Sequence, residues 1–333
     1  MTSCLRRFAR LSTVVLLGAM PACGGDGTGP DSSDTIGPIG PFPTGLTGKV
    51  AFTTIAVVTT SSQAYTETRV HVIDTSHPSD NVIYTVKDVF VEGLAWAPDG
   101  AHLLIQTFEF KDPGPNGENR DICQIFSVNM AGALDRSIFG GPGPAIHPGY
   151  SSHGVVAYFG GWSIDVATGN TNPASGIIID GRTRYSLPSW DANSYLSWEP
   201  NDQALVYTSD AFNGPPGLVR LSIADSSVTQ LVAPDSGEVI LQPAVSPDGS
   251  RIAVMRFAGK RNGEEIWTVS STGAVANQLT TGFADESPAW TPDGKYIAFV
   301  RSNPRPGIYV IPSGGGTPTR IIGGSTLLVA WSR

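Results

Sequence analysis

Cysteine is scarce in this chain of 333 residues, which contains only Cys4, Cys23 and Cys123. The first two lie close to the start, so a folded domain downstream would hold Cys123 alone and could form no internal disulfide. Cys123 lies in an alternating apolar run, which indicates a buried structural thiol. The fold must therefore be stabilised by packing.

Positive charge is also sparse, with 21 lysines and arginines against 29 aspartates and glutamates and a formal net charge of −8. Arg6, Arg7 and Arg10 lie in the first ten residues, which carry no acid, so the remainder is more acidic still. Such a surface repels the phosphate backbone of nucleic acids and anionic lipid headgroups. We expect no nucleic-acid partner.

The short motifs of common catalytic and metal chemistry are missing as well: there is no G-x-S-x-G, H-E-x-x-H, Walker loop or paired Cys-x-x-Cys. A metal site built from His147 and His153 is one alternative, but a structural role at a turn is favoured for His147. Residues 112–121 offer oxygens for Ca²⁺ without EF-hand spacing, which favours a solvated loop. We expect a protein without enzymatic activity, cofactor or metal.

No apolar run is long enough to span a bilayer, because the longest candidate, Leu11–Met20, has about half of the roughly 20 residues required. Basic residues precede this run and Pro21-Ala22-Cys23 follows it, so residues 1–22 are predicted to be a secretory signal peptide. The sequence around Cys23 resembles a bacterial lipobox, which makes Cys23 the acylated first residue of a mature lipoprotein. Simple cleavage near Ala22, with an unmodified Cys23, is the alternative.

Residues 23–48 are rich in Gly, Pro, Ser and Thr, which predicts a flexible tether. Several acyl chains on Cys23 would give stable anchoring. We therefore expect an exported protein, held at the periplasm or outer membrane of a Gram-negative bacterium, with the lipid anchor as its only membrane contact.

Turn-forming residues, in contrast, are abundant, with 39 glycines and 26 prolines. An apolar strand, a Pro-Asp-Gly turn and a second apolar strand recur along the chain. Proline presets φ, aspartate bonds its own backbone and glycine accepts positive φ, so the motif predicts a tight hairpin and its aspartate is a turn residue. Complete copies turn at Pro98, Pro247 and Pro292, and weaker copies are expected at Pro148 and Pro200.

Two further apolar segments follow each hairpin, and in the third repeat these are expected at residues 162–166 and 177–179. Four strands in every 45 to 52 residues are typical of a propeller blade. Residues 49–86 provide three strands without a first one, and residues 327–332 match that missing inner strand. We predict an all-β, six-bladed β-propeller over residues 49–333, with four antiparallel strands per blade and a ring closed by the C-terminal strand joining the N-terminal blade.

The pattern Trp-x-Pro-Asp-Gly followed by an apolar strand, as in 96–100 and 290–294, resembles the propeller repeats of the TolB family, also called WD40-like or PD40 repeats. The resemblance covers most of residues 49–333. It implies the propeller fold and leaves function open, because one fold hosts many functions. Trp96, Trp198, Trp290 and Trp331 share one repeat position, which predicts packing within and between blades.

The longest predicted connection between blades, residues 181–191, lies on the same face as the long loop that follows Phe108. Long loops around a propeller channel commonly bind ligands, and arginine and aromatic residues are favoured at interfaces. We predict a binding site formed by Arg182, Arg184, Tyr185, Trp190 and Phe110, with packing inside the loops as the alternative.

The expected function is that of a monomeric binding or scaffold module at the cell envelope that recognises a protein or a glycan. The alternative is a propeller enzyme of the lyase, lactonase or glycosidase type, with a site in the central channel. The inner strands carry mainly Ala, Trp, Val and Ser, which favours the binding module.

Overall fold

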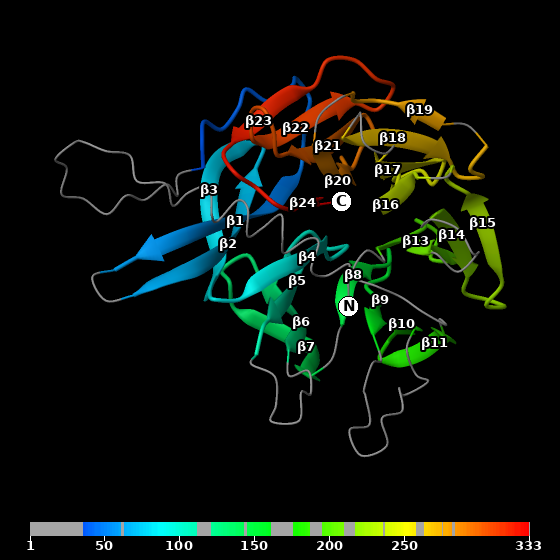
Figure 1. Cartoon of the computed structure of the whole chain (residues 1–333), viewed down its shortest axis with the longest axis horizontal. Coiled ribbons are helices and arrows are strands. Elements are labelled where there is room, and N and C mark those ends of the chain that lie inside the picture. Colours follow the sequence, from blue (N-terminus) through cyan, green and yellow to red (C-terminus); the bar gives the residue numbers. More distant parts are fainter. Residues whose placement is uncertain are drawn as a thin grey trace.

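The computed structural model describes residues 36–60, 63–111, 121–142, 145–160, 176–186, 195–209, 217–235, 237–257, 263–274, 276–281 and 284–332. In these segments 24 strands form six four-stranded sheets, arranged as blades around a common axis (Figure 1). Neighbouring strands of each sheet are antiparallel. The predicted all-β, six-bladed propeller is confirmed. None of these segments contains a helix long and apolar enough to cross a bilayer.

The strands run from the axis outwards in each blade. Blade one contains β24 (Val329–Trp331), β1 (Lys49–Thr59), β2 (Ala64–Asp74) and β3 (His77–Lys87). Blade two contains β4 (Phe90–Trp96), β5 (His102–Glu109), β6 (Ile122–Asn129) and β7 (Leu134–Pro142). Blade three contains β8 (Ile146–Tyr150), β9 (Val156–Gly160), β10 (Gly176–Ile179) and β11 (Arg182–Ser186).

The second half of the ring follows the same order. Blade four contains β12 (Leu196–Trp198), β13 (Ala204–Ser209), β14 (Gly217–Ser222) and β15 (Val228–Val232). Blade five contains β16 (Val239–Val245), β17 (Arg251–Phe257), β18 (Glu264–Ser270) and β19 (Ala276–Gln278). Blade six contains β20 (Asp285–Trp290), β21 (Tyr296–Arg301), β22 (Gly307–Pro312) and β23 (Thr319–Gly323).

The two ends of the propeller meet in blade one, as the sequence predicts. Strand β24 pairs with β1, with Val50 opposite Trp331 and Phe52 opposite Val329. The N–H of Ser332 donates to the carbonyl of Lys49 at 2.8 Å, and the Ser332 hydroxyl accepts from the Lys49 N–H. The first blade is therefore completed by the last strand, which removes an open sheet edge.

The hydrophobic core is divided among the spaces between blades. One cluster joins Phe52 and Ile73 of blade one to Val300 and Ile308 of blade six, and five further clusters fill the other inter-blade spaces. Central strands are thus buried on both faces, which explains their near-continuous apolar sequences. Each blade depends on two neighbours to bury its side chains.

The recurring tryptophans are buried and join successive blades, which confirms their predicted packing role. The indole N–H of Trp96 donates to the carbonyl of Ala330 at 3.2 Å, and that of Trp290 donates to Ala244 at 2.8 Å. The indole of Trp198 donates to Gly149 in the same way. Each acceptor lies on the inner strand of the preceding blade.

The Pro-Asp-Gly aspartates act as turn residues, as predicted. The carboxylate of Asp248 accepts from the Ser246 hydroxyl at 2.6 Å and from the Ser250 N–H at 3.0 Å. These bonds lower the pKa of Asp248 to about 2. Asp99 and Asp293 accept from the backbone N–H two residues later in the same manner.

The predicted turn of blade three was misplaced. The N–H of Gly154 donates to the carbonyl of Ser151, the bond that Gly100, Gly249 and Gly294 make in their own turns. Residues 151–154 therefore form this turn, with Ser152 and His153 in place of proline and aspartate. Pro148 instead follows His147 in a bulge of the inner strand, and the same bulge contains Gln242-Pro243 and Ser287-Pro288. His147, Gln242 and Ser287 have φ values of 51°, 54° and 54°.

Two strands of blade three also differ from the prediction. Residues 177–179, expected as the outer strand, belong to β10, the third strand, which pairs with β9. The outer strand is β11, over a segment that was expected to be a connection between blades. The predicted strand at 162–166 lies outside the described residues. The error arose because the sequence of β11, Arg-Thr-Arg-Tyr-Ser, is polar and lacks the apolar alternation that indicates a strand.

The second half of the predicted tether packs against the propeller. The N–H groups of Gly37 and Gly40 donate to the carbonyls of Gly323 and Ile321 on β23, and Ile39 forms an isolated bridge with Ile322. Leu46 is buried in the cluster between blades one and six. Residues 36–48 therefore pack with the propeller, which was expected to begin at residue 49.

Deleting residues 326–333 should abolish cooperative thermal unfolding, because β24 is the inner strand of blade one and supplies the buried Trp331. Circular dichroism melting of the truncated and parent chains tests this expectation. A truncated chain that melts like its parent would contradict ring closure by β24.

Candidate functional site

The turn of blade three is capped by an aspartate of blade four. Asp202 accepts from the backbone N–H of Ser152 at 2.8 Å, and from the N–H and the Nδ1 of His153 at 3.2 and 2.7 Å. Asp202 occupies the position that glycine has in the other turns, with a φ of 58°, a conformation that aspartate tolerates. The Asp202 carboxylate thus makes the turn contacts that an aspartate of blade three would make in a regular repeat. It also links blades three and four.

The electrostatics of Asp202 follow from these bonds. Burial acts to raise its pKa, but hydrogen bonds from His153, Ser152 and Ser151 outweigh burial and lower the pKa to about 2. The carboxylate side chain is only 16% exposed, whereas that of His153 is 82% exposed. The ionised form of Asp202 therefore stabilises the folded protein.

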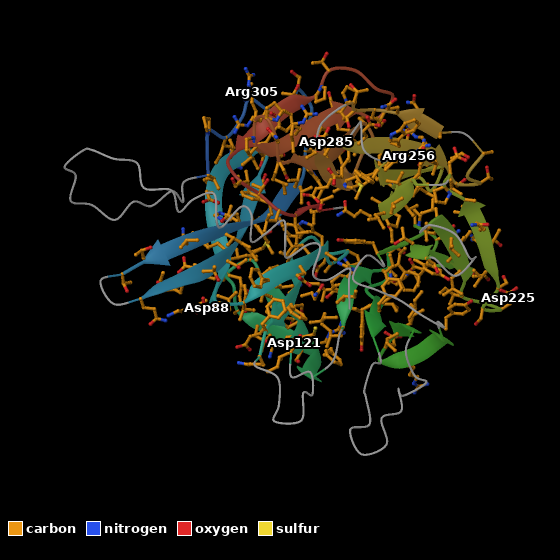
Figure 2. All side chains as sticks on the ribbon, in the orientation of Figure 1. Asp88, Asp121, Asp225, Arg256, Asp285 and Arg305 are labelled. Carbon is orange, nitrogen blue, oxygen red and sulfur yellow. The ribbon has the colours of Figure 1, made fainter. Side chains whose placement is uncertain are left out.

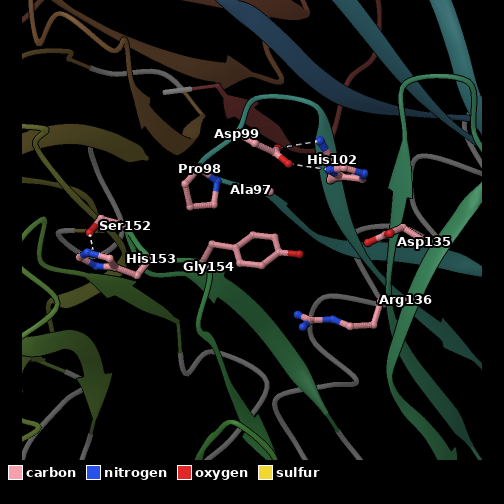
Figure 3. A pocket seen from close by; sticks show the side chains of 10 residues that line it. Ala97, Pro98, Asp99, His102, Asp135, Arg136, Ser152, His153 and Gly154 are labelled. Atoms are coloured by element: carbon pink, nitrogen blue, oxygen red, sulfur yellow. Dashed lines mark hydrogen bonds and ion pairs between the residues drawn. The ribbon is translucent and has the colours of Figure 1, made fainter.

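A hollow of about 590 Å³ lies beside this turn, between blades two and three. Figure 3 shows Asp99 and His102 on one side, Ser152 and His153 on another, and Asp135 and Arg136 on a third. The hollow is on the face that carries the Pro-Asp-Gly turns. Its full lining is Ala97, Pro98, Asp99, His102, Asp135, Arg136, Tyr150, Ser152, His153 and Gly154.

Tyr150 occupies the repeat position that holds tryptophan in four other blades. Its side chain is half-buried, and burial raises the pKa of its hydroxyl, against the opposing effect of the nearby Arg136. The hydroxyl also interacts with Ser127, which donates to Asp135 at 2.7 Å. The hollow therefore lies where blade three departs from the repeat at the tryptophan, proline and aspartate positions.

Other charged pairs have structural roles. Arg301 forms two bonds with the buried Asp285, at 2.6 and 2.7 Å, and lies over the ring of Tyr309. The pair Arg256–Glu238, with Arg256 over Trp267, occupies the corresponding part of blade five. Figure 2 shows Asp285 and Arg256 in these neighbouring blades.

Two of the residues predicted from the sequence as a binding site lie on opposite faces of the propeller. Arg182 is exposed at the start of β11, on the face of the Pro-Asp-Gly turns, whereas Phe110 follows the end of β5 on the opposite face. Tyr185 is half-buried and packs against the cluster between blades three and four. Arg184 lies on β11, and its side chain is outside the described part, as are Cys23 and Trp190.

His147 lies away from the hollow. It is buried, its ring stacks on Tyr195 with centroids 3.7 Å apart, and its N–H donates to Gln106. It lies at the opposite end of β8 from His153. Over the described segments no group of three His, Cys, Asp or Glu side chains is placed to hold a metal ion.

Comparisons with known proteins identify the architecture. The crystal structure of TolB from Acinetobacter baumannii superposes with a TM-score of 0.65 at 20% identity, covering 86% of this chain and 66% of TolB. A putative TolB from Agrobacterium tumefaciens gives 0.54 at 17% identity, covering 86% and 99%. The fold is a TolB-like propeller.

The relationship in sequence is more limited. The Tol-Pal system protein TolB of Francisella tularensis subsp. tularensis is 26% identical over 102 residues, which is 31% of this chain and 23% of that protein. The match thus spans less than a quarter of the relative. No protein-family model matches the sequence.

Substituting Asp202→Asn should destabilise the protein by about 1–2 kcal/mol at pH 7, because the ionised carboxylate caps the blade-three turn. The folded-state pKa lies below the ordinary value of 3.8, so this stabilisation is complete above about pH 4 and is lost as the pH falls towards 2. Urea unfolding at pH 7 and at pH 3 measures both effects.

The exposed Asp180, whose side chain forms no hydrogen bond with any described residue, provides the matched control Asp180→Asn. Equal stabilities of the two variants at pH 7 would refute the capping role of Asp202.

Proposed function

We propose that this chain is a binding module of the bacterial cell envelope that holds an extended segment of a partner protein, anchored through an acylated Cys23. The signal-like residues 1–22, the small residues before Cys23 and the scarcity of basic residues support export and lipid anchoring. The likeness to proteins named for a Tol-Pal system supports a protein partner in the envelope.

The observation that carries the proposal is an arm in blade one, formed by residues 54–59 of β1 and 64–66 of β2. Figure 1 shows β1 and β2 extending beyond the ring. The two strands remain paired in regular register up to Thr59 and Ala64. The arm is fixed at its base, because the N–H of Thr66 and the hydroxyl of Thr68 donate to Asp88 and Val89.

One edge of this arm offers backbone groups for pairing. Strand β24 pairs with β1 only as far as Phe52, and the next contact on this side is the Leu327 N–H bonded to the carbonyl of Thr53. Backbone groups alternate sides along a strand, so the N–H and C=O of Ile55, Val57 and Thr59 point to this same side. Within the described chain no strand covers them there.

An edge of this kind favours a polypeptide over a glycan. Extended peptides add to exposed sheet edges through main-chain hydrogen bonds, which sugars cannot reproduce as a ladder. The arm's first strand contains no charged residue between Thr53 and Thr59, and charge is a common device against edge pairing. Val57 is 43% exposed and would contribute apolar contact.

Aromatic side chains near the arm add contact area for a partner. Phe110 is 45% exposed and meets Phe108 and Phe90 edge-on, with centroids 4.7 and 6.1 Å away. Phe90 begins β4 two residues after Asp88, which holds β2. Of the site predicted from the sequence we retain Phe110 as a partner contact, and we propose Arg182, Arg184 and Tyr185 of β11 as a separate contact region. Trp190 lies outside the described residues and stays a prediction.

Substituting Val57→Pro should prevent partner capture, because proline removes the outward N–H and leaves the bonds between β1 and β2 intact. Val57→Ala keeps that N–H and is the matched control. A photo-crosslinking amino acid in place of Thr59, in the acylated protein within its native envelope, allows crosslinked peptides to be identified by mass spectrometry.

The proposal requires a partner peptide that crosslinks in the Val57→Ala protein and disappears in the Val57→Pro protein. Equal crosslinking in both variants, or crosslinks to glycan alone, would refute edge pairing.

A further inference from the structure

We propose that the hollow between blades two and three binds a small organic oxyanion, a carboxylate or a phosphate ester, through Arg136. The site lies on the opposite face from the arm and is independent of the protein-binding function proposed above. The argument rests on the balance of hydrogen-bond donors and acceptors around the hollow.

The carboxylates around the hollow already accept hydrogen bonds from the protein. Asp99 accepts from the N–H groups of Ala101 and His102 and from His102 Nδ1, at 2.8, 3.1 and 2.7 Å. Asp202 accepts from four donors of Ser152 and His153. Asp135 accepts from the Ser127 hydroxyl. Asp99 and Asp202 therefore have little acceptor capacity left for a ligand.

The donors, in contrast, are largely uncommitted. Arg136 is exposed, interacts with the Tyr150 hydroxyl and forms no ion pair with any carboxylate in the described segments. A guanidinium presents five N–H groups in a planar fork that matches two oxygens of a carboxylate or phosphate. An oxyanion would therefore satisfy donors that the protein leaves unused.

The two histidines are oriented by the same carboxylates. His102 and His153 each place Nδ1 2.7 Å from an aspartate oxygen, and neither Nε2 has a partner among the described residues. With Nδ1–H donated to the aspartate, each imidazole keeps Nε2 as an acceptor, which suits a hydroxyl group on a ligand that also carries the oxyanion. Among the lining residues Arg136 supplies the permanent positive charge, so the oxyanion is placed there.

Size and overall charge restrict the ligand further. A volume of about 590 Å³ lies within the roughly 300–1,000 Å³ typical of small-molecule sites. The net charge of −8 repels polyanions at long range. A small ligand with one anionic group fits both constraints.

Calorimetric titration of the complete purified chain with glucuronate, glucose 6-phosphate and glucose tests the proposal. These sugars share a ring, so glucose is the neutral control, and the other two distinguish a carboxylate from a phosphate ester. Substitution Arg136→Gln should weaken binding of the anion at least about tenfold, as expected for a lost charge-assisted bond. The exposed Arg305, far from the hollow in blade six, provides the control Arg305→Gln.

We expect at least one anionic sugar to bind and glucose not to bind. The double variant His102→Gln/His153→Gln should weaken binding less than Arg136→Gln does, because it keeps the guanidinium that pairs with the oxyanion. Binding of glucose as strong as that of the anions, no binding of either anion, or binding unaffected by Arg136→Gln would overturn the proposal.

Discussion

The pairing of β24 with β1 is the constraint on which the rest of the structure depends. Each hydrophobic cluster lies between two blades, so no blade buries its side chains without both neighbours. A ring with one blade lacking its inner strand would expose apolar surface on two sides. Closure by three residue pairs therefore secures a core that is distributed around the whole molecule. Within the described segments the core needs no disulfide, because their one cysteine, Cys123, is a buried thiol.

Blade three is the blade whose hairpin turn departs most from the repeat. Tryptophan is replaced by Tyr150 and proline-aspartate by Ser152-His153, while the capping carboxylate comes from Asp202 of the next blade. The exchange keeps the turn closed and brings a histidine to the surface. The hollow with its uncommitted arginine lies beside this altered turn. Repeats conserve packing chemistry in most copies, so a copy that departs at several positions together is a natural location for function.

The fold was predictable because turn chemistry and apolar strands recur at a fixed interval. Blade three was misaligned because Pro148 resembles a turn proline. Pro243 and Pro288 precede the turns of their own repeats in the same way, and Gly154 stands before an apolar run, so these two signals could have corrected the alignment. The hollow was not predictable from any motif, because Arg136 and His153 lie in different blades and meet only through packing. The arm was missed because residues 49–86 were expected only to provide three strands of a blade, whereas the pairing of β1 continues to Thr59.

The central claim, that the altered turn of blade three creates a ligand site in an otherwise regular ring, can be tested by restoring the repeat. A variant with Tyr150→Trp, Ser152→Pro, His153→Asp and Asp202→Gly would carry the residues of the other turns at all four positions. Calorimetric titration with the anionic sugar that the parent binds, beside a melting curve, is the decisive measurement. The account predicts a folded protein that melts no lower than its parent and binds that anion at least about tenfold more weakly. Unchanged affinity in a folded variant would contradict it.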